Sequence, residues 1–415
     1  MIKFQKYTLS NGLRVIVHED HSTPLVCVSV AYNVGSKHEH PDKTGFAHLF
    51  EHLMFGGSAN IKDFDKPMQL AGGDNNAYTN NDMTNFYDVM PAENMEIAFW
   101  LESDRMMQLS FNEKVLNTQK KVVIEEFKET CLNEPYGDMW HHLSAMAYQQ
   151  HPYSWPTIGK DISHIAQATL EDVKSFFFNH YRPDNAVLTI AGKTSTDAAV
   201  EMAEKWFGDI PRGNIPQISF SPEPKQLEKR CKTIRADVPS PAIYMGFPMA
   251  DRLSKDYYVA DLITDLLANG RSSRFYKHLY KEKKMFSTID AFVSGYTDCG
   301  LLLIEGKPMP GVDLNLAKEA IWEELRQLMN VPVPANELAK LRNTLESSLI
   351  YSEVSILNKA LALGYFEILG KADRINEEGA IYQSITQEDL MRVAREIFRE
   401  DNLNELTYLP DESAK

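Results

Sequence analysis

Cysteine is scarce in this chain, and long apolar runs are absent. The four cysteines among 415 residues stand far apart and include no C-x-x-C pair, which argues against a disulfide framework or a cysteine metal site. We therefore expect reduced, partly buried thiols and a cytoplasmic protein. No stretch reaches the roughly 18 apolar residues that a transmembrane helix needs. Residues 1–8 lead directly into a strand pattern without a signal sequence, and whether a leader has been removed stays open.

Positive charge is also in deficit. Lysine and arginine total 43 against 58 aspartates and glutamates, which gives a formal net charge of −15. Nucleic acids need basic patches on their protein partners, so we expect no nucleic-acid partner. The acidic balance suits neutral or basic peptides, or serves solubility alone.

The chain is long enough for more than one domain, and its predicted elements follow the same order twice. Strand patterns precede helical patterns in the first half, and the order restarts after a proline-rich, polar stretch at 212–230. We predict an α+β protein of two structurally similar α/β domains, 1–211 and 231–415, joined by a linker at 212–230. Each domain is expected to hold a mixed or antiparallel sheet with helices packed on one face, as a duplicated unit would.

Residues 48–52 read His-Leu-Phe-Glu-His, a spacing that favours a metal site. On a helix, His48 and His52 lie one turn apart on the same face, so both imidazoles can bind one Zn²⁺. Glu51 lies close to that face and can hold the water that the metal acidifies. The pattern is the H-x-x-E-H form of the zinc-peptidase signature, the reverse of H-E-x-x-H. It predicts hydrolysis of peptide bonds.

A chance pair of histidines is the simpler explanation, because 12 histidines in one chain produce some H-x-x-x-H pairs that hold no metal. The flanking residues argue against chance. Apolar side chains surround the three polar ones: Phe46, Ala47, Leu49, Phe50, Leu53, Met54 and Phe55. Three ionisable groups in so apolar a helix are costly without a shared partner, and a metal is the natural one.

A catalytic zinc of this kind takes three protein ligands and leaves one position open. The predicted helix 112–132 offers Glu125, Glu126 and Glu129 as the third ligand. Its apolar stripe comprises Leu116, Val123, Phe127 and Thr130. Only Glu126 lies on that stripe, so helical phase favours it, and solvated charge is the alternative for all three. Gln119, two turns earlier on the same face, could support the site.

Several segments together resemble the pitrilysin and mitochondrial-processing-peptidase family of inverted-motif zinc peptidases, and the chain looks most like the short bacterial two-domain subunits. In the first half the motifs are G-F-A-H-L-F-E-H-L-M-F-G-G-S at 45–58, G-G-D-N-N-A-Y-T at 72–79, V-V-I-E-E at 122–126, H-P-Y-S-W-P-T-I-G at 151–159 and Y-R-P-D-N-A at 181–186. In the second half they are G-R-S-S-R-F at 270–275 and I-T-Q-E-D-L at 385–390. The resemblance covers essentially the whole chain and implies a processing-peptidase-like half-clamshell.

The resemblance implies one Zn²⁺ per chain on the predicted ligand set, Glu51 as general base, and a C-terminal domain without a metal site. It also implies that Asn76 and Ala77, on an edge strand, bind the substrate backbone. An edge strand can take an extended peptide as an added strand, so recognition would rest mainly on backbone; an ordinary turn is the alternative at this point. Arg274 is a candidate contact for substrate or partner, with helix capping as its alternative.

Two features depart from the family pattern. Many active members carry a glutamate seven residues before the glutamate ligand, where this chain has Gln119. Members with a complete site also carry, in the C-terminal half, an arginine and seven residues later a tyrosine, which hold substrate carbonyls and the developing oxyanion. The matching positions here are Tyr280 and Ser287.

We therefore predict a zinc metalloendopeptidase that cleaves peptides or unfolded segments enclosed in a chamber. A homologous partner subunit would supply the missing arginine and tyrosine in a heterodimer, with a homodimer as the alternative assembly. The rival is a non-catalytic or weakly active scaffold subunit of the same fold. Gln119 and the missing pair favour the rival, whereas the intact zinc-binding set opposes it.

Overall fold

The computed structural model describes residues 1–216 and 218–411, which form two compact units. Unit 1 comprises Met1–Lys128, Trp155–Phe220 and Leu349–Glu377, and unit 2 comprises Glu129–Ser154, Ser221–Ser348 and the chain from Glu378 onwards. Each unit therefore contains a segment from the other half of the sequence. The consecutive domains 1–211 and 231–415 stay a prediction, and the compact units differ from them by these exchanged segments.

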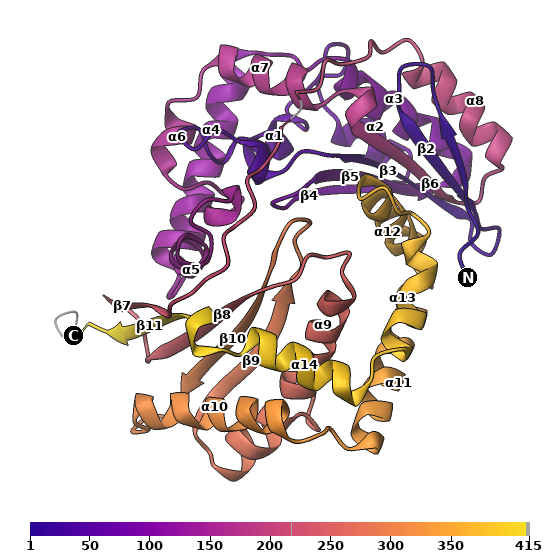
Figure 1. The fold of residues 1–415 in the computed structure, drawn as a ribbon. Coiled ribbons are helices and arrows are strands. Elements are labelled where there is room, and N and C mark those ends of the chain that lie inside the picture. Colours follow the sequence, from indigo (N-terminus) through magenta and orange to yellow (C-terminus); the bar gives the residue numbers. More distant parts are fainter. Residues whose placement is uncertain (217, 412–415) are drawn as a thin grey trace. The chain divides into compact units, whose positions relative to one another are not determined.

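Unit 1 is built on a six-stranded mixed sheet in the order β1-β2-β6-β3-β5-β4 (Figure 1). Its strands are β1 (Gln5–Thr8), β2 (Arg14–Glu19), β3 (Leu25–Tyr32), β4 (Asp74–Thr79), β5 (Thr84–Pro91) and β6 (Ala186–Gly192). The β2–β6 pair is parallel and the remaining neighbours are antiparallel. Since β4 stands last in this order and pairs with β5, it forms an edge of the sheet.

Helices cover both faces of this sheet. They are α1 (Phe46–Leu53), α2 (Asp65–Leu70), α3 (Met95–Met107), α4 (Glu113–Phe127), α6 (Ile162–Ala166), α7 (Leu170–His180), α8 (Thr196–Phe207) and α12 (Ile356–Ile368). Successive residues of a strand point to opposite faces. Val28 and Val30 of β3 join the main core with α1, α3, α7 and α8, whereas Cys27 and Ala31 pack with α12. The sequence predicted helices on one face, and α12, from late in the chain, adds cover on the second.

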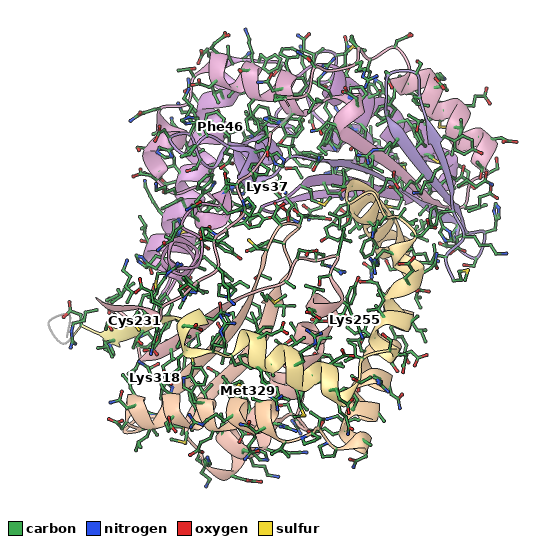
Figure 2. All side chains as sticks on the ribbon, viewed as in Figure 1. Lys37, Phe46, Cys231, Lys255, Lys318 and Met329 are labelled. Carbon is green, nitrogen blue, oxygen red and sulfur yellow. The ribbon has the colours of Figure 1, made fainter. Side chains whose placement is uncertain are left out.

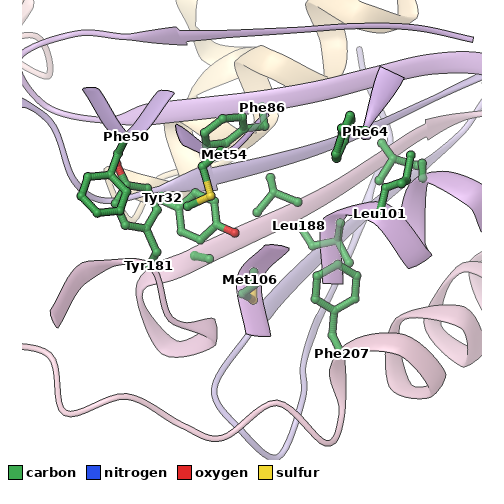
Figure 3. Packing of buried hydrophobic residues seen from close by; sticks show 14 of the residues in the cluster. Tyr32, Phe50, Met54, Phe64, Phe86, Leu101, Met106, Tyr181, Leu188 and Phe207 are labelled. Carbon is green, nitrogen blue, oxygen red and sulfur yellow. The ribbon is translucent and has the colours of Figure 1, made fainter. Parts of the chain in front are cut away.

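Aromatic rings fix α1 to the core of unit 1 (Figure 3). Phe50 of α1 stacks on Tyr181, with ring centroids 5.0 Å apart and an interplanar angle of 22°. Tyr32 of β3 meets the Tyr181 ring edge-on at 5.0 Å. All three side chains are fully buried, so the apolar side of α1 is held against the sheet and its polar side is left facing away from this core.

Unit 2 repeats the mixed-sheet plan with five strands in the order β7-β11-β8-β10-β9. They are β7 (Arg230–Ala236), β8 (Ala242–Met249), β9 (Phe286–Ser294), β10 (Gly300–Pro308) and β11 (Asn404–Pro410), with β7 and β11 parallel. Helix α5 (Met139–Ala147) packs on β8 and β11, and helices α9 (Lys255–Ala268) and α14 (Gln387–Ile397) contact β9 and β8. Two mixed sheets with packed helices confirm the predicted α+β class.

Three further α-helices occur among the described residues: α10 (Leu314–Asn330), α11 (Ala335–Ser352) and α13 (Arg374–Gln383). The sequence pattern predicted no helix at the position of α13. The predicted helix 112–132 is α-helical only to Phe127, and Lys128–Asn133 continue it as a π-helix. This change of winding falls at the point where the chain passes from unit 1 to unit 2.

Two properties noted from composition have a structural counterpart. Within residues 1–216 and 218–411, no helix combines the length and the apolar character that crossing a bilayer requires. All four cysteines are thiols, as predicted: Cys27 and Cys131 are buried, Cys231 is exposed and Cys299 is half-buried.

Candidate metal centre

Helix α1 presents its polar residues on one side. Its buried residues are Phe46, Ala47, Leu49, Phe50 and Leu53. His48, Glu51 and His52 are half-buried, with exposed side-chain fractions of 14% for His48 and 24% for His52. The histidines are therefore shielded but accessible, as a site that admits a substrate requires.

Helix α4 packs beside α1 and brings Glu126 to the two histidines. The Nε2 atoms of His48 and His52 lie 3.3 Å apart. The Glu126 carboxylate oxygens lie 3.6 Å from Nε2 of His48 and 3.4 Å from Nε2 of His52. Donors bound tetrahedrally to zinc at about 2.0–2.1 Å would be roughly 3.3–3.4 Å apart. The three side chains thus fit a zinc ion with little rearrangement.

No second group of this kind occurs in the part of the chain that the structure describes. There, His48, His52 and Glu126 are the one set of three or more histidine, cysteine or acidic side chains placed to share a metal. The adjacent His141 and His142 belong to no such set, and His142 instead bonds Asp138 through Nε2 at 2.9 Å. A nitrogen, nitrogen, oxygen donor set is typical of catalytic zinc.

The protonation states suit metal binding. Burial lowers the pKa of His48 and His52 adds to this effect, while Glu126 and Glu51 oppose it. A hydrogen bond with His52 lowers the pKa of Glu126, and the charges of both histidines act in the same direction against burial. A neutral imidazole and an ionised carboxylate are the forms that bind metal. The Nδ1 of His48 is buried and has no hydrogen-bond partner among the described residues.

The other candidates on α4 lie away from this centre. Glu125 is 71% exposed and pairs with Lys128 at 2.7 Å, and Glu129 is exposed in the π-helix. The structure thus brings Glu126, the residue that helical phase favoured, to the two histidines. Gln119 is half-buried on α4, and no hydrogen bond of its side chain occurs among the described residues. Its supporting role stays a prediction.

The edge strand β4 lies next to α1 in unit 1. Asn76 is exposed and Ala77 is half-buried, opposite Tyr87 and Phe86 of β5. The Asn76 side-chain Oδ1 accepts a hydrogen bond from the Ala77 N–H at 2.8 Å. The segment is therefore a strand and not the ordinary turn that the sequence left open, and its free edge can take an added strand.

In unit 2, Arg274 does not cap a helix through a side-chain hydrogen bond. Its guanidinium pairs with Glu337 at 3.0 Å and is 11% exposed. Tyr280 is 43% exposed and stacks on Tyr276 with ring centroids 5.2 Å apart. Tyr280, Ser287 and Lys307 line one cavity of 560 Å³.

One residue near the metal centre, Glu39, was not predicted from the sequence. Its contacts run from a loop to the start of α1 and follow no local sequence pattern.

Comparison with known families gives two matches that together span most of the chain. The family described as Insulinase (Peptidase family M16) matches residues 14–161, and the Peptidase M16 inactive domain matches residues 167–345. The three candidate ligands and Glu51 all fall in the first match, and Arg274 falls in the second.

Relatives and solved structures agree with these matches. A protein named zinc protease PqqE from Helicobacter pylori is 28% identical over 404 residues, 96% of this chain and 91% of the relative. The probable mitochondrial-processing peptidase subunit beta of Schizosaccharomyces pombe is 25% identical over 415 residues, 95% of this chain and 89% of the relative. The crystal structure of a protease from Helicobacter pylori superposes with a TM-score of 0.95 at 26% identity, covering 99% of this chain and 100% of that one. A peptidase M16 inactive domain from Pseudomonas fluorescens shares the fold, with a TM-score of 0.89 at 18% identity over 99% and 98% of the two chains.

Proposed function

This chain belongs to peptidase family M16, and we propose that it is a zinc-dependent endopeptidase acting on peptides or unfolded segments. One observation carries the proposal. Ligand atoms of His48, His52 and Glu126 converge within 4.8 Å of one another, on the helix pair that also carries Glu51. Relatives named zinc proteases support the metal.

In this proposal the Nε2 atoms of His48 and His52 and the Glu126 carboxylate hold one zinc ion per chain. When bound, the ion polarises a carbonyl as a Lewis acid and acidifies a water molecule. Glu51 accepts the proton of the attacking water and passes it to the leaving amine as the peptide bond breaks. Because Glu51 precedes His52 directly on α1, the packing that holds the histidines also holds the base.

The substrate binds as an extended strand along β4. Backbone groups at the free edge, near Asn76 and Ala77, pair with the peptide main chain, as in other cases of strand addition. Main-chain pairing reads no side chain, so the enzyme accepts many sequences. Enclosure in a chamber, and not a specificity pocket, then selects peptides and unfolded segments over folded proteins.

A second subunit completes the active site. Tyr280 and Ser287 stand where members with a complete site carry arginine and tyrosine, and the Arg274 guanidinium is already paired with Glu337. A homologous partner that carries the pair would stabilise the oxyanion of the reaction. One relative is named as a beta subunit of a mitochondrial-processing peptidase, which supports a division of labour between subunits. A homodimer would hold two zinc sites and no such pair.

Metal removal is the direct test of this function. We expect the purified protein to hold about one zinc per chain, as three protein ligands with one open position predict. A chelator should abolish hydrolysis of a quenched fluorescent peptide, and added zinc should restore it. Zinc content by atomic absorption and peptide turnover are the measurements. Cleavage that persists in the metal-free protein would contradict the proposal.

The rival is a scaffold subunit with little activity of its own. It is favoured by Gln119 in place of glutamate and by the missing arginine and tyrosine. The same measurements separate the two functions, because chelator-sensitive cleavage by a scaffold subunit would stay absent or weak even after a second subunit is added.

A further inference from the structure

The first turn of α1 lacks a cap of its own. Its N-cap residue is Gly45, which has φ 86° and no side chain to accept a hydrogen bond. The first N–H groups of a helix have no partner within the helix and need one elsewhere. Here the carboxylate of Glu39 provides it: Oε2 accepts from the Gly45 N–H at 2.9 Å, and Oε1 accepts from the Ala47 N–H at 2.8 Å.

A tryptophan completes the surroundings of this carboxylate. The Nε1–H of Trp155 donates to Glu39 Oε2 at 3.2 Å and to the Ser36 carbonyl at 3.1 Å. Glu39 is 6% exposed and Trp155 is 5% exposed. Burial raises the pKa of Glu39, whereas the hydrogen bonds from Ala47, Gly45 and Trp155 lower it and favour the ionised carboxylate. Both carboxylate oxygens face N–H donors, and the positive end of the helix dipole favours an anion at this place.

The segment 35–39 also binds the turn between β4 and β5. The Ser36 N–H donates to the Asn80 carbonyl at 3.2 Å, and the Lys37 N–H donates to the Asn81 carbonyl at 3.0 Å. The Lys37 ammonium pairs with Asp82 at 2.9 Å, and both side chains are buried. Figure 2 shows Lys37 in this segment and Phe46 in the first turn of α1. One short segment therefore contacts both the start of the metal-bearing helix and the end of the edge strand.

Close backbone packing limits movement of α1 in another direction. A Cβ atom added at Gly45 would lie 2.8 Å from the Ile158 carbonyl oxygen, and one added at Gly159 would lie 3.1 Å from the Gly45 Cα. Glycine at both positions lets the two backbones touch. The start of α1 is thus held between residues 158–159 and the Glu39 carboxylate.

We propose that Glu39 is a positioning residue of the metal centre, which fixes the start of α1 and so sets His48 and His52 against Glu126 and the edge strand β4. The inference rests on the proposed function, because it concerns the same zinc site. Ala47 directly precedes His48, so a shift at the Glu39 contact passes to the first ligand without an intervening hinge. Groups that hydrogen-bond directly to metal ligands typically contribute 10- to 100-fold in metal affinity or activity. Glu39 acts through the backbone of α1, so we expect an effect at the low end of that range.

The test compares zinc affinity in Glu39→Gln with a matched control. Glutamine keeps the size of the side chain but turns one acceptor oxygen into an NH₂ group that faces N–H donors, so α1 should shift. We expect zinc binding, measured by chelator competition, to weaken about tenfold. The control is Asp42→Asn, which removes a carboxylate that is 88% exposed three residues later; it should bind zinc like the unchanged protein.

A milder variant guards against misfolding. Trp155→Phe removes one donor to Glu39 and should weaken zinc binding in the same direction but less, and the double variant should lose less than the sum of the two. If Glu39→Gln does not fold, the zinc affinity of Trp155→Phe alone tests the inference. Normal zinc affinity in these variants would overturn the inference about Glu39 and leave the proposed function unaffected. This holds whether or not the metal-free protein melts at a lower temperature. Absence of zinc binding by the unchanged protein would overturn the proposed function and the inference with it.

Discussion

Glu51→Gln should abolish peptide cleavage and leave zinc binding intact. Glutamine has the size of glutamate but cannot take a proton from water at neutral pH, so the general-base step is lost. General acid–base groups contribute about 10²–10⁴ in rate, and we expect a fall of this size in kcat. The metal is held by His48, His52 and Glu126, so zinc content should stay at that of the unchanged protein. Peptide turnover and zinc content are measured on one preparation.

A matched control for this variant lies on the neighbouring helix. Glu125 is exposed and paired with Lys128, so Glu125→Gln should change neither turnover nor zinc content. If Glu51→Gln cleaves peptide at the unchanged rate, the assignment of the base is wrong. If it loses zinc together with activity, the loss reports on the metal site and not on proton transfer.

The chain alone should cleave slowly and gain about 10²–10³-fold in kcat when a homologous subunit with the arginine and tyrosine is added. That range is the usual effect of a donor to the oxyanion of acyl transfer. The partner is recognised by its sequence, as a homologue that has the arginine and tyrosine and lacks H-x-x-E-H. Turnover of a quenched peptide is measured against partner concentration and should saturate as the complex forms.

Substitution within the chain gives an independent test of the same idea. Tyr280→Arg combined with Ser287→Tyr restores the pair and should raise the activity of the purified chain if it assembles with itself. Tyr276 lies one turn earlier and beside Tyr280. Tyr276→Arg adds the same charge away from the position that matches the family's arginine, so it should not raise activity. Full activity of the unchanged chain, unaffected by any second subunit, would refute the division of labour.

Local pattern was enough to select the candidate metal residues. His48 and His52 are four residues apart, and a helix alone puts them on one face. Glu126 was favoured over Glu125 because it lies on the apolar stripe of its helix, and in the structure it faces the histidines while Glu125 pairs in solvent with Lys128. Both inferences need only the period of a single helix, applied to the order of residues in the sequence.

Features that depend on distant contacts could not be read in the same way. Glu39 lies six residues before Gly45, outside the spacing of a capping box, and its acceptor role exists only because the chain folds back to place it at the start of α1. The exchange of segments between the two units also depends on contacts between residues far apart in the sequence. Helix α12 has an ordinary apolar stripe, and nothing local indicates that it packs on β3 and β6, more than 150 residues earlier.

The sequence by itself determined the α+β class, most helices and strands, and a set of side chains able to hold zinc, because each follows from the period of a single element. Tertiary structure alone decided which sheet each helix covers and how Glu39 and Trp155 hold the start of α1. Those outcomes depend on pairing and packing between segments far apart in the chain. No local period carries that information.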